Sequence, residues 1–156
     1  MNDSAGVNEL HPIPDLSPDL FDQLKDYVQF TPEDEARLRT LLPVVRPDFD
    51  AIADHFYERV MAFPDAMAVF TEGPTQVERL KKTMVRWLET GLSGPHDRDY
   101  FEARAKIGQV HVLIGLPQHY MFTAMNVMRV DLQRRVLDLA QDATMTLEEA
   151  RTTMDA

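Results

Sequence analysis

Apolar residues recur along this chain at the three- and four-residue spacing of amphipathic helices, and no segment alternates with the two-residue period of a strand. Prolines, glycines and N-capping residues divide the chain into segments of helical length. The sequence therefore predicts an all-α fold. The expected helices cover residues 18–29, 32–42, 47–63, 65–70, 75–90, 97–114, 118–141 and 146–156.

The helix expected over 118–141 is apolar on more than one side. One seam repeats at steps of four, three and four, as in helical bundles; it consists of Met121, Met125, Met128, Leu132, Val136 and Leu139. A second set, Phe122, Ala124, Val127 and Val130, makes the first half of the helix apolar nearly all round. Because such a helix must be covered on all sides, we predict a homodimer through the helices near 118–141 and 146–156. The alternative is that the domain covers this helix alone.

The two ends of the chain differ in character. Residues 1–15 are acidic and contain proline, which predicts a flexible leader. Thr146 and Glu149 form a capping-box pattern at the start of the last helix, but no glycine or proline ends that helix. We therefore expect residues 16–156 to be one domain, truncated ahead of a C-terminal output domain.

Composition narrows the function classes. The 156 residues suit one domain, and the lack of cysteine excludes disulfides, thiolate zinc sites and cysteine nucleophiles. The formal net charge of −10 argues against binding to nucleic acid or to an anionic membrane. No apolar run reaches the roughly 20 residues that span a bilayer, and no secretion signal begins the chain. The expected location is cytoplasmic.

His111 is the residue most indicative of chemistry. It lies on an apolar helical stripe with Ile107, Val110 and Ile114. A histidine in such a stripe most often hydrogen-bonds a backbone group, and otherwise it binds a ligand that accepts imidazole.

Two other polar side chains lie on apolar stripes. Tyr57 shares the helix near 47–63 with Phe49, Ile52, Ala53, Phe56, Val60 and Phe63, and Thr83 lies beside Val77, Leu80, Met84, Trp87 and Leu88. Core packing explains each residue taken singly. Together with one histidine they fit a haem pocket, in which His111 binds iron and the tyrosine and threonine supply polar contacts on the opposite side.

Several segments resemble the sensor globin of globin-coupled sensors. The most specific is Ile107–Pro117, with the pattern Ile-Gly-x-Val-His-x-x-Ile-Gly-Leu-Pro; the others are Tyr27–Asp34, Ile52–Tyr57, Gln76–Lys81, Trp87-Leu88 and Tyr120-Met121. The resemblance extends in register from Leu16 to Gln141. It implies a globin fold with an extra N-terminal helix and without a D helix. One departure is Leu92, near which the family pattern has an aromatic residue.

The resemblance also implies the roles of site residues. His111 would be the proximal ligand of haem b iron, and Tyr57 would hydrogen-bond oxygen on the distal side. Leu80 and Thr83 match distal positions that control ligand access or offer another contact, and Tyr120 would anchor the second ring nitrogen of the proximal histidine. The other residues expected to line the pocket are Phe56, Phe70, Val77, Met84, Trp87, Val110 and Ile114. His55, His96 and His119 are expected at the surface or at helix ends, with His119 as the rival ligand.

The expected function follows from this pocket. The domain would be a haem-based sensor of oxygen, with carbon monoxide and nitric oxide as other gases, and would not itself be an enzyme. It would pass a conformational signal to an output module, either a histidine kinase or a diguanylate cyclase, with a chemotaxis transducer as a further option. The alternatives are a haem-free globin-like protein-interaction module and a stand-alone oxygen carrier.

Overall fold

A computed structural model of the chain describes residues 19–141 and 145–155, and these residues contain helices and no strand. The predicted all-α class is therefore confirmed, whereas the predicted leader, 1–15, lies outside the described residues. The elements are α1 (Leu20–Tyr27), α2 (Pro32–Val45), the short 3₁₀ helix η1 (Arg46–Asp48), α3 (Phe49–Met61), α4 (Pro64–Met67), α5 (Pro74–Ser93), α6 (Arg98–Leu113), α7 (Gln118–Gln141) and α8 (Leu147–Asp155).

Side-chain caps begin several of these helices where the sequence predicts them. Thr31 caps α2 by accepting the Asp34 backbone N–H at 3.3 Å, and the Asp34 carboxylate accepts the Thr31 N–H at 2.9 Å. The same reciprocal pair forms between Thr146 and Glu149 ahead of α8, at 3.1 and 2.8 Å. Such pairs satisfy backbone donors that the first helical turn leaves without partners.

Two helices extend beyond their predicted ends. The second continues through Pro43 to Val45, and α5 continues through Gly91 to Ser93. In both cases a buried residue lies in the added turn, Val45 in one and Leu92 in the other. Burial of an apolar side chain stabilises a turn by an amount comparable to the cost of a proline or glycine near a helix end. The local breaker signal was therefore overridden by packing.

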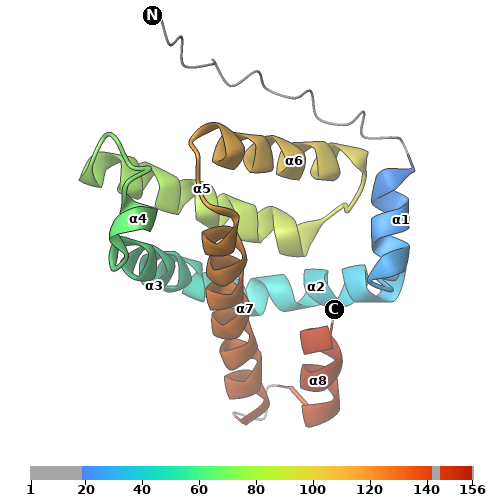
Figure 1. Cartoon of the computed structure of the whole chain (residues 1–156). Coiled ribbons are helices and arrows are strands. Elements are labelled where there is room, and N and C mark those ends of the chain that lie inside the picture. The colour runs from blue at the N-terminus through green and yellow to red at the C-terminus, as the bar shows by residue number, and fades with distance from the viewer. Residues whose placement is uncertain (1–18, 142–144, 156) are drawn as a thin grey trace, which may run out of the picture.

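The core lies where α2, α3, α5 and α7 cross, and its least exposed large side chains are Val45, Phe49 and Leu88. Figure 1 shows α7 crossing α2 and α3 and continuing beyond them to pack against α8. The outer helix α6 is different, because it belongs to none of the closely packed helix pairs and contains no buried residue. In Figure 1 it lies over α5 as a separate rod.

The fully buried residues of the predicted α7 seam all lie at or after Met128. Met128, Val136 and Leu139 are buried, but Met125 is exposed, as is Phe122 on the second apolar face. Within the described ranges, every helix is too short or too polar to cross a membrane.

Candidate functional site

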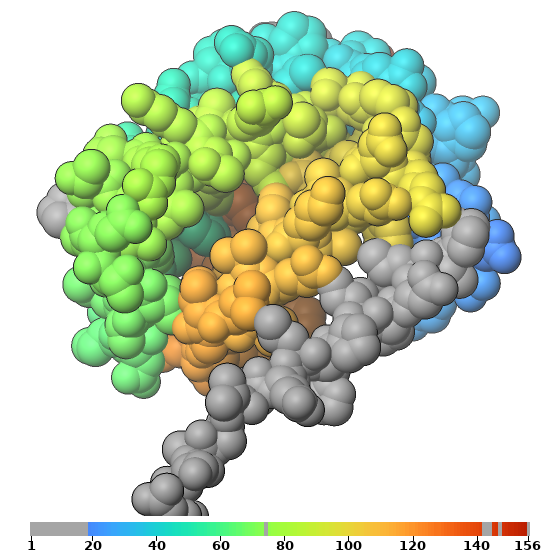
Figure 2. Space-filling model, turned by 90° about the horizontal axis from the view of Figure 1, so that it is seen from above, coloured from blue at the N-terminus to red at the C-terminus, as the bar shows by residue number. Residues whose placement is uncertain are grey.

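A hollow lies beside α6. Figure 2 shows it between α6 on one side and α4 and α5 on the other, with α3 and α7 visible at its floor. The helices that carry the predicted site residues border this hollow: Phe56 and Tyr57 come from α3, Val77 to Trp87 from α5, and Val110 and His111 from α6. The topology thus brings three separate segments of the sequence to one space.

Tyr57 is buried within an aromatic cluster. Its ring makes edge contacts with Phe56 and Phe70, with ring centroids 5.0 and 6.4 Å apart. Burial raises the pKa of the Tyr57 hydroxyl to about 12, because the phenolate would lack solvation. The side-chain hydrogen bonds of the described residues do not include its O–H, and this atom is not among their fully buried unpartnered ones. At neutral pH, Tyr57 therefore presents a protonated donor in apolar surroundings.

His111 is half-buried, and burial lowers its pKa below the usual value. Its Nδ1 atom is buried and has no hydrogen-bond partner within the described part of the chain. The common fate of a core histidine, a hydrogen bond to a backbone group, is thus not found at this nitrogen. The imidazole is neutral at pH 7, which is the form that binds a metal ion.

Tyr120 makes no hydrogen bond to His111 among the bonds of the described residues. Its ring instead lies beside that of His119, with centroids 4.5 Å apart. Its expected role beside the proximal histidine stays a prediction.

The other predicted pocket residues fall into two groups. On α5, Val77 and Met84 are buried, and Leu80 and Trp87 pack partly buried against the core. On α6, Val110 and the adjoining Ile114 are 52% and 45% exposed although both are apolar. Side chains of the described residues therefore cover the α5 wall but leave the apolar stripe beside His111 uncovered.

Thr83 lies among the exposed residues of α5, and its hydroxyl donates to the Arg79 carbonyl at 3.2 Å. This bond occupies its one proton within its own helix. In this arrangement Tyr57, rather than Thr83, has a hydroxyl proton free for another acceptor.

These observations fit a haem group. Haem needs a neutral imidazole on one side, apolar walls for its ring and limited polarity on the other side. His111 offers the imidazole on an uncovered apolar stripe, and Tyr57 offers one donor within an aromatic cluster.

The other histidines have different surroundings. His96 follows α5, and its side chain is only 7% exposed; its Nε2 lies 2.8 Å from the Gly91 carbonyl. His55 on α3 pairs with Asp131 on α7 at 2.7 Å, and Asp131 also faces Arg134. His119 is exposed, beyond the break at Pro117.

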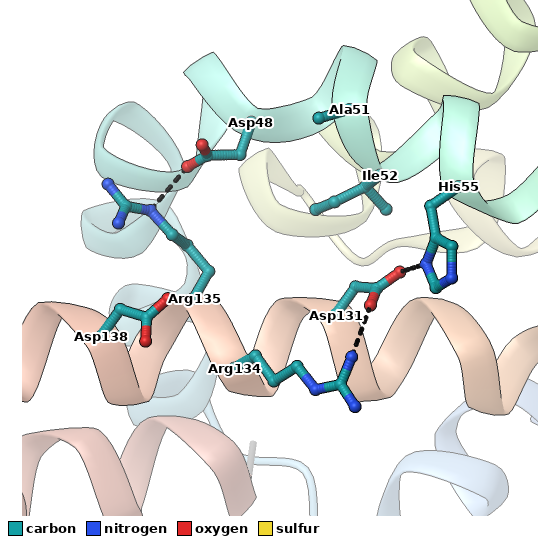
Figure 3. Close-up of a pocket in the computed structure, with 8 residues that line it drawn as sticks. All are labelled: Asp48, Ala51, Ile52, His55, Asp131, Arg134, Arg135 and Asp138. Carbon is teal, nitrogen blue, oxygen red and sulfur yellow. Dashed lines mark hydrogen bonds and ion pairs between the residues drawn. The ribbon is translucent and has the colours of Figure 1, made fainter.

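The His55 pair belongs to a polar pocket of about 250 Å³ between α3 and α7, drawn in Figure 3. Arg135 and Asp48 close its other end with an ion pair of 2.6 Å. Within the described residues no group of three or more histidines and carboxylates is placed to hold a metal ion. The two side-chain pairs join α7 to α3 and η1, and no pattern in the sequence predicted them.

Comparison with known proteins points to one family. The Protoglobin family model matches residues 17–156. The heme-based aerotactic transducer HemAT of Halobacterium salinarum is 30% identical over 87 residues, which are 55% of this chain and 18% of the transducer. The chain therefore corresponds to about a fifth of that relative. The globin domain of a Geobacter sulfurreducens globin-coupled sensor superposes with a TM-score of 0.76 at 30% identity, covering 86% of this chain and 85% of that one.

Proposed function

Since this chain belongs to the protoglobin family and is a sensor globin of the globin-coupled sensors, we propose that it is a haem-binding gas-sensor domain of a longer signalling protein. The observation that carries this proposal is His111, a neutral histidine with an unpartnered buried nitrogen on an uncovered apolar stripe. We propose haem b as the cofactor and oxygen as the principal gas. Carbon monoxide and nitric oxide are further candidates.

His111 holds the cofactor in this proposal. One imidazole nitrogen would bind the iron, and the other would donate its proton to an acceptor that fixes the orientation of the imidazole, a role we assign to Tyr120. When bound, haem supplies an iron centre that takes up a diatomic gas. Val110 and Ile114 of the α6 side and Val77, Leu80, Met84 and Trp87 of α5 would be the apolar side chains that hold the haem.

Tyr57 is proposed as the group that recognises the gas. Its high pKa keeps the phenol protonated, so it donates a hydrogen bond to a bound molecule that carries partial negative charge. Oxygen gains more from such a donor than carbon monoxide does. A single hydrogen bond of about 1 kcal/mol would change gas affinity several-fold. Leu80 would control access of the gas to the iron. Thr83 would offer another hydrogen bond to the gas once its hydroxyl no longer donates to the Arg79 carbonyl.

The signal would leave the pocket through α6. Only residues 114–117 separate the end of α6 from the start of α7, so a shift of the His111 turn is passed directly to that helix. We propose that α7 and α8 form the dimer interface and convey the shift to a C-terminal histidine kinase or diguanylate cyclase. The globin domain itself would not catalyse a reaction.

Visible absorption spectroscopy tests the cofactor. The purified protein is expected to show a strong Soret band that shifts on reduction and again on adding oxygen or carbon monoxide. His111→Ala should lose the haem, whereas the control His119→Ala should retain it.

Two results would contradict the proposal. Retention of stoichiometric haem with an unchanged spectrum in His111→Ala would remove the proximal assignment. A colourless wild-type protein that takes up no added haem would favour the haem-free interaction module.

A further inference from the structure

The helices α5 and α6 have a closed end and an open end. At the open end, α6 carries Val110, His111 and Leu113 with no buried residue among them. At the closed end lies Arg104, which is seven residues before His111 and thus two helical turns away on the same face. The turn that carries His111 and the turn that carries Arg104 therefore belong to one rigid helix.

Arg104 makes three contacts with α5 and a fourth with a ring of its own helix. Its guanidinium lies 4.2 Å from the ring centre of Trp87 on α5 and 4.7 Å from that of Tyr100 on α6. Nη2 donates to the Trp87 carbonyl at 2.7 Å and to the Thr90 hydroxyl at 3.0 Å. A planar guanidinium can stack on rings and donate sideways at once, which a lysine ammonium cannot do.

Gly91 lies beside the Arg104 guanidinium, but the arrangement does not require a glycine there. A Cβ atom added at Gly91 would lie 3.4 Å from Arg104 Nη2, at the limit of ordinary contact. Among the hydrogen bonds of the described residues, the two from Arg104 are those that join α6 to α5. Ring contacts of Phe21 on α1 with Tyr100 and Phe101 also hold this part of α6, so Arg104 supplies the hydrogen bonds to α5 but not all the contacts.

We propose that Arg104 is a positioning residue for His111: its clamp on Trp87 and Thr90 fixes the middle of α6, about which the His111 turn moves. The clamp thereby sets the separation between His111 and α5, which also carries Trp87 and Leu80 of the pocket. This role rests on the proposed function only in so far as His111 binds iron. The clamp itself is a property of the polypeptide.

The clamp is tested first without haem, by a distance measurement between spin labels. Because the chain has no cysteine, a single labelled pair is introduced cleanly by Lys82→Cys on α5 and Val112→Cys on α6, both exposed. Arg104→Ala is expected to broaden the distance distribution or shift it. The matched control Lys106→Ala removes a positive charge from an exposed site on the same helix and is expected to leave the distribution unchanged.

The positioning role is tested next in the haem-loaded protein. Arg104→Lys keeps the positive charge but loses the planar guanidinium with its several donors. It is therefore expected to shift the iron–histidine stretching band in the resonance Raman spectrum. It should also speed haem dissociation by about tenfold, the loss of one charge-assisted hydrogen bond. Circular dichroism confirms that each variant is folded. If Arg104→Ala does not fold, the distance distribution of Arg104→Lys tests the clamp in its place.

The outcomes separate this proposal from the proposed function. An unchanged distance distribution in Arg104→Ala overturns the clamp. A changed distribution with an unchanged iron–histidine band overturns the positioning role. If the wild-type protein takes up no haem, the proposed function fails and the distance distribution alone decides whether Arg104 fixes α6.

Discussion

Tyr57 is a phenol enclosed by apolar and aromatic side chains, and its ionisation is linked to folding. Its pKa is about 12 in the folded protein and about 10 in the unfolded chain, so the folded state holds the proton more tightly. Its contribution to stability is complete below pH 10 and is lost as the pH rises from 10 to 12. A difference of two pKa units corresponds to at most about 3 kcal/mol in the free energy of unfolding.

We therefore expect Tyr57→Phe to flatten the alkaline loss of stability. The free energy of unfolding from urea titrations should fall less between pH 9 and 11.5 in this variant than in the wild type. Tyr27→Phe is the control, because Tyr27 is 86% exposed and should leave the pH profile unchanged. Equal alkaline slopes for the wild type and Tyr57→Phe would contradict the assignment.

For His111 we expect stability to depend on pH in the opposite direction. Burial lowers its pKa below 6.5, so between that lowered pKa and 6.5 the unfolded chain binds a proton that the folded protein does not. The stability of the haem-free protein is then fully present above about pH 6.5 and declines as the pH falls. His111→Gln should lose less stability than the wild type between pH 7.5 and 5.5 in urea titrations. His119→Gln, a change at an exposed site, should behave as the wild type does; the interpretation fails if the two variants respond alike.

At the scale of a helix, the caps make a measurable contribution. Thr31 satisfies the Asp34 backbone N–H at the start of α2, and Thr31→Ala should lower the free energy of unfolding by about 1 kcal/mol. Thr40→Ala is the matched control: its hydroxyl bonds the Ala36 carbonyl inside the same helix, where alanine is the better helix former. Thermal unfolding followed by circular dichroism compares them, and equal losses in both variants would show that the cap is not the cause.

Local sequence signals predicted the helix bounds well where no packing against residues distant in the sequence overrode them. The bounds of α7 match the prediction of 118–141, because Pro117 precedes it and its apolar pattern is continuous. The ends of α2 and α5 were missed, since Val45 and Leu92 are buried by residues far away in sequence. The identity of buried partners is not encoded in a local pattern.

The helices that carry the candidate site residues were predictable to a similar extent, whereas the roles of these residues stay predictions. The apolar stripe and motif around His111 identified the candidate ligand, and the aromatic stripe identified Tyr57. Arg104 was missed, because its contact with Trp87 joins residues 17 positions apart on different helices. The ion pair between His55 and Asp131 is separated by 76 positions and was missed for the same reason. Periodicity shows which face of a helix is apolar, but it does not show which helix lies opposite.

At the scale of the whole molecule, α7 has apolar side chains that no other described residue covers. Phe122 is 66% exposed, and Met125 and Leu137 of the same helix are also exposed. Several large apolar side chains exposed on one helix are typical of a surface that another chain covers. A second copy is the simplest such partner, because a twofold pair covers the same face on both subunits.

The proposed dimer can be separated from haem binding by one substitution. Sedimentation velocity should show a dimer for the wild type at micromolar concentration. Phe122→Asp should weaken it by roughly thirtyfold or more, since an aromatic residue at an interface centre contributes about 2 kcal/mol or more. The Soret spectrum should not change. Val112→Asp is the control, because Val112 is 72% exposed but lies on α6, away from the proposed interface. Dissociation by Val112→Asp and not by Phe122→Asp would move the interface to α6, where the sensing helix itself would make the contact and the signal would not need to pass through α7.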